Sequence, residues 1–154
     1  GGENLGIALS DAVSGPLTCV MGIIKADKEN VYATLDLRCP VLASQAEIIK
    51  LARMNLSGVD LAVTSQTAPH HVPADTELVR SLMAAFTEVT GIEGKPLAIG
   101  GGTYAKCLEE GVAFGALFPG QKEMAHQADE YISIENLKKN LRIFTHALLK
   151  LCAK

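Results

Sequence analysis

The feature that most constrains the fold is a clean alternation of apolar and other side chains over residues 31–38. The odd positions hold Val31, Ala33, Leu35 and Leu37, and the even positions hold Tyr32, Thr34, Asp36 and Arg38. Successive side chains of a β-strand point to opposite faces, so this period of two predicts a strand with one buried face. Its polar second face is typical of antiparallel sheets. Pro40 ends the strand, because proline cannot donate to a ladder.

Short apolar runs around this strand predict further strands over residues 5–9, 17–24 and 59–64, with turns at 14–16 and 26–30. Residues 44–47 form a capping box that opens a helix to about residue 55, with Ile48, Leu51 and Ala52 facing inward. Strands followed by a helix and another strand indicate a small open α+β sheet with helices on one face.

Residues 65–73 contain two prolines and no periodicity, so we expect a linker there. Beyond it, Asp75 is expected to cap a helix that ends at Gly91, and Ser133 to cap a final helix. Strands are predicted at 96–99 and 112–117, and a helical turn at 103–110. The first helix carries apolar residues at spacings of three and four, and the last carries a single apolar stripe. These residues are Leu78, Leu82, Met83, Phe86 and Val89 in the first, and Ile134, Leu137, Leu141, Phe144, Leu148 and Leu151 in the last. Alternating helices and strands indicate an α/β layer.

Charge, apolar runs and cysteine spacing exclude several classes of function. Net charge is −3, and the basic residues are scattered apart from Lys138, Lys139 and Arg142, so nucleic acid is not expected as a partner. No run of 18 apolar residues and no signal peptide is visible, which predicts a cytoplasmic protein without a membrane span. The four cysteines are widely spaced, which excludes a zinc ribbon and favours reduced thiols. The opening Gly-Gly-Glu, without Met, suggests a processed or cleaved chain.

The chain is apolar for its size. Mean hydropathy is +0.21 although aromatic residues make up only 5%. We therefore expect it to bury surface against a partner subunit or against a missing part of the same protein.

Three local features could carry chemistry. Glycines at 100–102 before Thr103 would let a ligand approach the backbone closely, or would simply form a flexible connection. His126 lies beside carboxylates in a long loop, where a surface histidine is the more common finding. Arg38, at the end of the alternating strand, could clamp a carboxylate or remain solvated. The adjacent His70 and His71 point opposite ways in extended chain, so one ion does not suit both.

Three ordered blocks carry a family resemblance. Residues 99–106 read Ile-Gly-Gly-Gly-Thr-Tyr-Ala-Lys, residues 111–120 read Gly-Val-Ala-Phe-Gly-Ala-Leu-Phe-Pro-Gly, and residues 124–132 read Met-Ala-His-Gln-Ala-Asp-Glu-Tyr-Ile. With upstream segments at 5–7, 14–18 and 35–40, they resemble the C-terminal part of the dinuclear-zinc peptidases that include carnosinase, aminoacylase and glutamate carboxypeptidase. The bacterial dipeptidase V-like branch is the nearest, and the resemblance covers almost the whole chain.

This resemblance implies part of a ferredoxin-like lid domain at 1–66, followed by the C-terminal αβαβα part of the catalytic domain at 67–154. It implies hydrolysis of dipeptides or short N-acyl amino acids with two zinc ions. His126 would be a zinc ligand, Arg38 would hold the substrate carboxylate, and Gly101, Gly102 and Thr103 would line the cleft. Many relatives have Asp where this chain has Tyr104, so no role is carried over to that position.

The resemblance also implies what is missing. The other metal ligands and the Glu base belong to an N-terminal half, and the Glu109-Glu110 pair stands in the wrong order to replace that base. One histidine cannot hold zinc tightly, because protein zinc sites need three or four ligands. We therefore expect no catalytic residue in this chain, no activity from it alone, and a need for the N-terminal half; homo-oligomerisation stays open. A non-catalytic binding or assembly module and one half of a two-chain enzyme are the alternatives.

Overall fold

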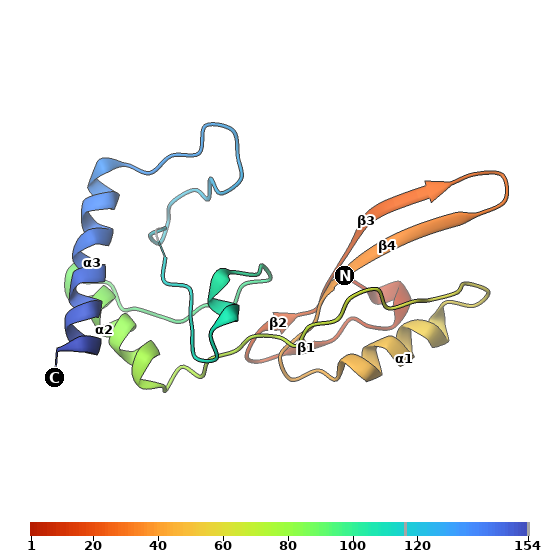
Figure 1. Cartoon of the computed structure of the whole chain (residues 1–154), viewed down its shortest axis with the longest axis horizontal. Helices are drawn as coiled ribbons and strands as arrows, with labels where there is room; N and C mark the ends of the chain where they lie inside the picture. Colours follow the sequence, from red (N-terminus) through yellow and green to blue (C-terminus); the bar gives the residue numbers. More distant parts are fainter. Residues whose placement is uncertain (116, 154) are drawn as a thin grey trace. The chain divides into compact units, whose positions relative to one another are not determined.

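The computed structural model describes residues 1–115 and 117–153, and its contacts divide the chain into two compact units (Figure 1). The first comprises residues 1–71 with 98–102, and the second comprises residues 72–97 with the described residues from 103 onward. Helices and small antiparallel sheets make up the described regular structure, which confirms the α+β class. The division into a lid at 1–66 and a catalytic portion at 67–154 stays a prediction.

A long hairpin dominates the first unit. Strand β3 (Thr18–Ala26) pairs antiparallel with β4 (Val31–Arg38), as predicted for both strands. The Asp27 carboxylate closes the connecting turn by accepting the N–H groups of Glu29 and Asn30, each at 2.8 Å. These backbone donors lower the pKa of Asp27. The register shifts between Met21 and Ile23, so the intervening glycine forms a bulge that strengthens the local twist.

The core of the first unit covers only one end of this hairpin. Its buried residues are Ile7, Leu17, Ile48 and Ala52, and Leu37 of β4 packs against them. The expectation of a strand buried along one face is therefore wrong beyond this end, because Val31 is 74% exposed and Ala33 is exposed as well. Nothing among the described residues covers the far end of the sheet's apolar face, which explains the difference.

Helix α1 (Gln45–Asn55) supplies the second layer of this core. The Ser44 hydroxyl accepts the N–H of Glu47 at 3.3 Å, so the predicted cap is confirmed. Ile48 and Ala52 are buried and Leu51 is half-buried, as the periodicity predicts. At the other end, Asn55 donates through Nδ2 to the Leu5 carbonyl at 3.2 Å and thereby ties the helix to the chain start.

Two predicted strands of the first unit are wrong. Residues 5–9 do not form a strand: a 3₁₀ turn η1 (Glu3–Leu5) ends at Gly6, whose φ is 66°, and only β1 (Ser10–Asp11) pairs with β2 (Gly15–Pro16). Residues 59–64 carry no strand either. A strand needs a partner along its edge, and β3 and β4 pair only with each other among the described residues.

The second unit contains the two predicted long helices. In α2 (Glu77–Thr90) the capping side chain is that of Thr76, which accepts the N–H of Val79 at 3.3 Å; the expected cap at Asp75 is off by one residue. Gly91 ends α2 with φ 70°, as expected of a left-handed C-cap. In α3 (Ile134–Cys152) the predicted cap Ser133 accepts the N–H of Asn136 at 3.1 Å.

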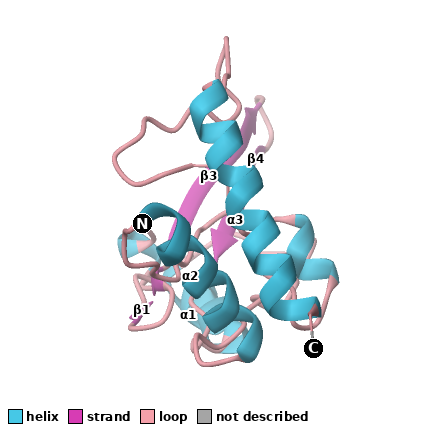
Figure 2. Cartoon of the chain, turned by 90° about the vertical axis from the view of Figure 1, so that its left-hand side faces the viewer, coloured by secondary structure: helices cyan, strands magenta, loops and turns pink. Residues whose placement is uncertain are grey.

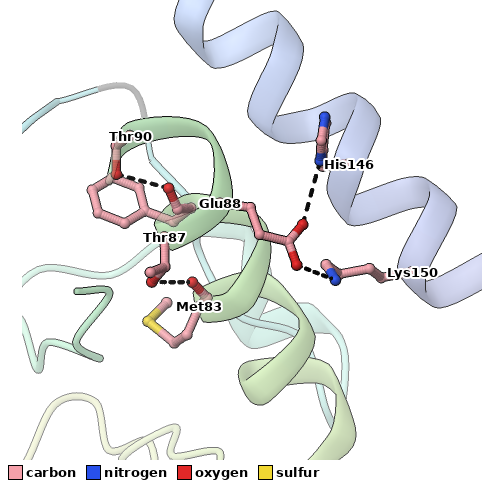
Figure 3. A network of polar contacts seen from close by, with 7 residues as sticks. Met83, Thr87, Glu88, Thr90, His146 and Lys150 are labelled. Carbon is pink, nitrogen blue, oxygen red and sulfur yellow. Dashed lines mark hydrogen bonds and ion pairs between the residues drawn. The ribbon is translucent and has the colours of Figure 1, made fainter. Parts of the chain in front are cut away.

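Helices α2 and α3 pack against each other (Figure 2). Their contact is built on the buried Leu82, Ala85 and Ala147, and the two alanines allow a close approach of the backbones. A carboxylate bridges the helices at the surface: Glu88 accepts from Lys150 Nζ at 2.7 Å and lies 3.4 Å from His146 Nδ1 (Figure 3). Lys150 first, and then His146, lowers the pKa of Glu88.

The apolar stripe predicted for α2 is buried or half-buried. The stripe predicted for α3 is exposed apart from Leu151, which is half-buried and packs on the α2–α3 core. Helix α3 buries Asn140, Ile143 and Ala147, whereas Leu137 is 56% and Leu141 is 68% exposed. The small Ala147 lets this neighbouring face approach α2, so the contact surface is rotated away from the predicted stripe.

No strand forms at 96–99 or in the described part of 112–117, so these predictions are also wrong. Both are short apolar runs for which the described chain offers no paired edge, although Val112 and Phe114 pack on the α2–α3 core. The predicted helical turn is confirmed as the 3₁₀ helix η2 (Tyr104–Cys107).

Candidate substrate- and metal-binding residues

Arg38 is the last residue of β4, where it stands opposite Thr18. Its Nη2 lies 3.0 Å from Asp36 Oδ2, two residues earlier on the same face of the strand, and its side chain is 52% exposed. An exposed pair of this kind contributes about 0–1 kcal/mol. A guanidinium carries five N–H donors, so this contact leaves it able to receive a second carboxylate.

The chain just after Arg38 is held by the Asp11 carboxylate. Asp11 Oδ2 accepts the N–H of Leu42 at 2.8 Å, and Oδ1 accepts the N–H of Val13 at 2.9 Å and of Ser14 at 2.5 Å. The Ser14 hydroxyl donates to Asp11 at 3.0 Å and accepts the N–H of Val41 at 2.9 Å. These bonds join two segments about 30 residues apart in sequence and fix the strand end that presents Arg38.

These donors also change the acidity of Asp11. The Leu42 N–H, followed by the Ser14 N–H, lowers the pKa of Asp11 from 3.8 to about 2. Asp11 was not among the candidate residues that the sequence motifs indicate. The sequence signal for its role is the spacing of Asp11 and Ser14 around a turn, since Asp side chains readily accept hydrogen bonds from the backbone two or three residues further along.

The glycine loop is open. A side chain added at Gly100 or Gly101 would meet nothing within 4 Å, and neither residue has a positive φ. Neither packing nor backbone conformation therefore requires glycine at these two positions, which leaves flexibility or close approach of a ligand as their use. Thr103 is the N-cap residue of η2, yet its hydroxyl does not cap the helix.

His126 lies in a turn of unusual backbone conformation. The Gln127 N–H donates to the Met124 carbonyl at 3.0 Å, and His126 has φ 62°. Asp129 follows with φ 59°. The His126 N–H donates to Glu130 Oε2 at 3.2 Å, and the histidine side chain is exposed. Left-handed residues other than glycine cost about 1–2 kcal/mol each and cluster at functional sites.

Among the described residues, no three His, Cys, Asp or Glu side chains come together in a group that could hold a metal ion. His70 and His71 lie in an irregular, exposed segment, and His146 contacts Glu88. His126 therefore remains a single candidate ligand. Arg38, Gly101 and Gly102 belong to the first unit and Thr103 and His126 to the second, so their meeting in one cleft stays a prediction.

A family model described as Peptidase family M20/M25/M40 matches residues 4–150. The chain belongs to this peptidase family. This membership confirms the resemblance drawn from the three sequence blocks. It does not test the roles of single residues, which remain predictions for this M20 peptidase chain.

The relatives of this M20 chain carry dipeptidase names. It is 36% identical over 151 residues to "Putative dipeptidase YtjP" of Bacillus subtilis, a match that covers 97% of this chain and 32% of that protein. It is 34% identical to "Putative dipeptidase SH1171" of Staphylococcus haemolyticus and 33% identical to "Putative dipeptidase" of Staphylococcus epidermidis, in both cases over 99% of this chain and 33% of the relative. The chain thus spans about a third of the length of these relatives.

Within the described part of this M20 chain, no helix has both the length and the apolarity needed to cross a bilayer.

Proposed function

We propose that this chain is part of a zinc-dependent dipeptidase that hydrolyses dipeptides or short N-acyl amino acids. The observation that carries the proposal is the family match over residues 4–150, together with relatives named as dipeptidases. Because the chain spans only a third of those relatives, the complete activity would need the remaining polypeptide.

Arg38 is proposed to bind the free carboxylate of the substrate. Three features support this role: it ends a strand, it is half exposed, and its neighbouring backbone is anchored by Asp11 and Ser14. A planar guanidinium can bind a carboxylate through two parallel hydrogen bonds. Because the backbone that carries Arg38 is anchored, its side chain would orient the substrate at little entropic cost.

His126 is proposed to be one ligand of the metal site. The family is generally metal-dependent, and an exposed imidazole is a suitable zinc donor. Zinc, when bound with ligands from the remaining polypeptide, would polarise the peptide carbonyl and make bound water acidic. The contribution of this chain is to hold the imidazole on a turn shaped by the His126 N–H contact with Glu130.

The glycine loop is proposed to line the substrate cleft. Gly100 and Gly101 leave open space beside the backbone, so a peptide substrate could approach the main chain directly. The hydroxyl of Thr103 does not cap η2, so it could form a hydrogen bond with a substrate at the end of this loop.

The decisive experiment uses the protein at the full length of its relatives with a free dipeptide and the same dipeptide as its C-terminal amide. Arg38→Ala is expected to raise KM for the free dipeptide about tenfold or more, since a charge-assisted bidentate contact is lost, and to leave KM for the amide almost unchanged. Arg53→Ala, on the exposed side of α1, is the matched control and should change neither. Failure of the wild-type protein to cleave any dipeptide, with zinc present, would refute the proposed function.

A further inference from the structure

Strands β3 and β4 form a hairpin (Figure 1), and one of its faces is exposed around Arg38. In the register of the two strands, Arg38 stands opposite Thr18, and Asp36 stands opposite Val20. Directly opposite residues of an antiparallel pair lie on the same face, with Cβ atoms about 5 Å apart. All four side chains are exposed, whereas Leu37, on the other face, packs on the core of the first unit. These four residues form what we call the Arg38 patch.

Asp36 is the charged neighbour of Arg38 within this patch. Arg38 Nη2 donates to Asp36 Oδ2 at 3.0 Å, so the guanidinium is turned back along β4 toward the Asp36–Val20 pair. The Val20 side chain beside this pair is 59% exposed. The guanidinium keeps further N–H donors for a second carboxylate. A substrate carboxylate bound there would bring the C-terminal residue of the substrate next to Asp36 and Val20.

The charges of the patch become unbalanced when a substrate carboxylate binds. Arg38 supplies one positive charge, which the Asp36 carboxylate already compensates. A second carboxylate, that of the substrate, leaves the group with one excess negative charge. The next cation on this face of the two strands is Lys25, which stands opposite Tyr32. At about 3.3 Å per residue, that pair lies about 20 Å along the strands from Arg38, which is too far to compensate the charge.

We propose that Asp36 is a specificity-determining residue that disfavours dipeptides with an acidic C-terminal residue. The side-chain carboxylate of such a residue enters a patch that already carries an excess negative charge, and it is repelled. A neutral side chain of the same length meets no repulsion, and the exposed Val20 offers its aliphatic part an apolar contact. The inference rests on the proposed role of Arg38 and deepens it, because it adds the class of C-terminal side chain that the same site accepts, which is neutral or basic.

The test compares Ala-Glu with Ala-Gln, two dipeptides of nearly the same shape that differ in the charge of the C-terminal side chain. The quantity measured is the ratio of kcat/KM for Ala-Glu to that for Ala-Gln, in the zinc-loaded full-length protein. Asp36→Asn is expected to raise this ratio about two- to tenfold, as Coulomb's law gives for charges roughly 6–8 Å apart in a half-exposed site. Asp36→Glu keeps the charge and should keep the wild-type ratio. Glu29→Gln removes an exposed carboxylate from the distant hairpin turn and, as the matched control, should leave the ratio unchanged.

Two outcomes would overturn the inference while the proposed function stands. One is cleavage with a ratio that Asp36→Asn leaves unchanged. The other is an equal rise in KM for both peptides in that variant, which would show that Asp36 only orients Arg38. If the wild-type protein cleaves neither peptide, their dissociation constants are measured by calorimetry instead. Weaker binding of Ala-Glu that disappears in Asp36→Asn would then refute only the proposed hydrolysis, and a protein that binds neither peptide would overturn both proposals.

Discussion

The two candidate binding elements are built in opposite ways. The strand end that presents Arg38 is anchored by side-chain bonds to a segment about 30 residues away, with Asp11 and Ser14 accepting the N–H groups of Leu42 and Val41. The turn that carries His126 is held by local contacts: the Met124–Gln127 bond and the bond from His126 N–H to Glu130. It also contains two left-handed residues that are not glycine.

This difference shows where each element can obtain its rigidity. The Arg38 end is fixed within this chain, as suits its proposed role of recognising a substrate by geometry. The His126 turn contains two left-handed residues that are not glycine, each at a conformational cost, and the bonds that hold it are local. Such a turn fits the proposed role of His126 as one ligand of a metal site that other segments would complete.

Removing the proposed metal ligand should have the largest effect. In the full-length protein, His126→Ala is expected to lower kcat/KM by at least about a hundredfold and to reduce the bound zinc, because even outer-shell changes at metal sites cost 10–100-fold. The control is His71→Ala, which removes an exposed histidine from an irregular segment. Metal analysis and dipeptide kinetics on both variants decide the matter. Unchanged metal content and activity in His126→Ala would remove this residue from the site.

The contrast between local and distant contacts also explains what the sequence could reveal. Both helix caps at Ser44 and Ser133 and the turn at Asp27 were predictable, because each depends on residues within three or four positions. The alternation over 31–38 identified β4 for the same reason. The family and the candidate residues Arg38 and His126 were identified from short ordered sequence blocks, which can be recognised without knowledge of the tertiary structure.

The failures share one physical cause. Residues 59–64 and 112–115 have the composition of strands, but a strand exists only where a second edge accepts its hydrogen bonds. Periodicity identified an apolar stripe on α3, but it does not show which neighbour covers that face, and Leu137, Leu141, Phe144 and Leu148 are exposed. Asp11 was missed because its partner Leu42 is distant in sequence.

The second prediction removes the anchor of the Arg38 end. Asp11→Ala should lower the thermal midpoint by several degrees and raise KM for a free dipeptide, because the chain after β4 loses its fixed position. Asp27→Ala is the matched control: this carboxylate also accepts two backbone N–H groups, but only within its own turn. It should lower the midpoint less and leave KM unchanged. Equal effects of both variants on KM would show that Asp11 does not position Arg38.

The acid range provides an independent readout of the same anchor. The folded pKa of Asp11 is about 2, below its ordinary 3.8, so its contribution to stability is complete above about pH 4. That contribution is lost as the pH falls through the folded value. The difference in thermal midpoint between the wild type and Asp11→Ala should therefore shrink between about pH 4 and pH 2. A difference that stays constant across this range would contradict the role of the ionised carboxylate.

The smallest effect concerns the strained turn. Asp129 has φ 59°, so Asp129→Gly is expected to relieve strain and to raise the free energy of unfolding by at most about 1 kcal/mol, because the gain is reduced by the greater freedom of glycine in the unfolded chain. Ala128→Gly, one position earlier and without a positive φ, should instead lower stability by about 0.5–1 kcal/mol. Denaturant unfolding of both variants distinguishes the signs. If the two changes destabilise equally, the left-handed backbone at Asp129 carries no cost. If the signs are opposite, the turn maintains a costly conformation, and zinc affinity of the full-length Asp129→Gly protein then measures what that conformation contributes to holding His126.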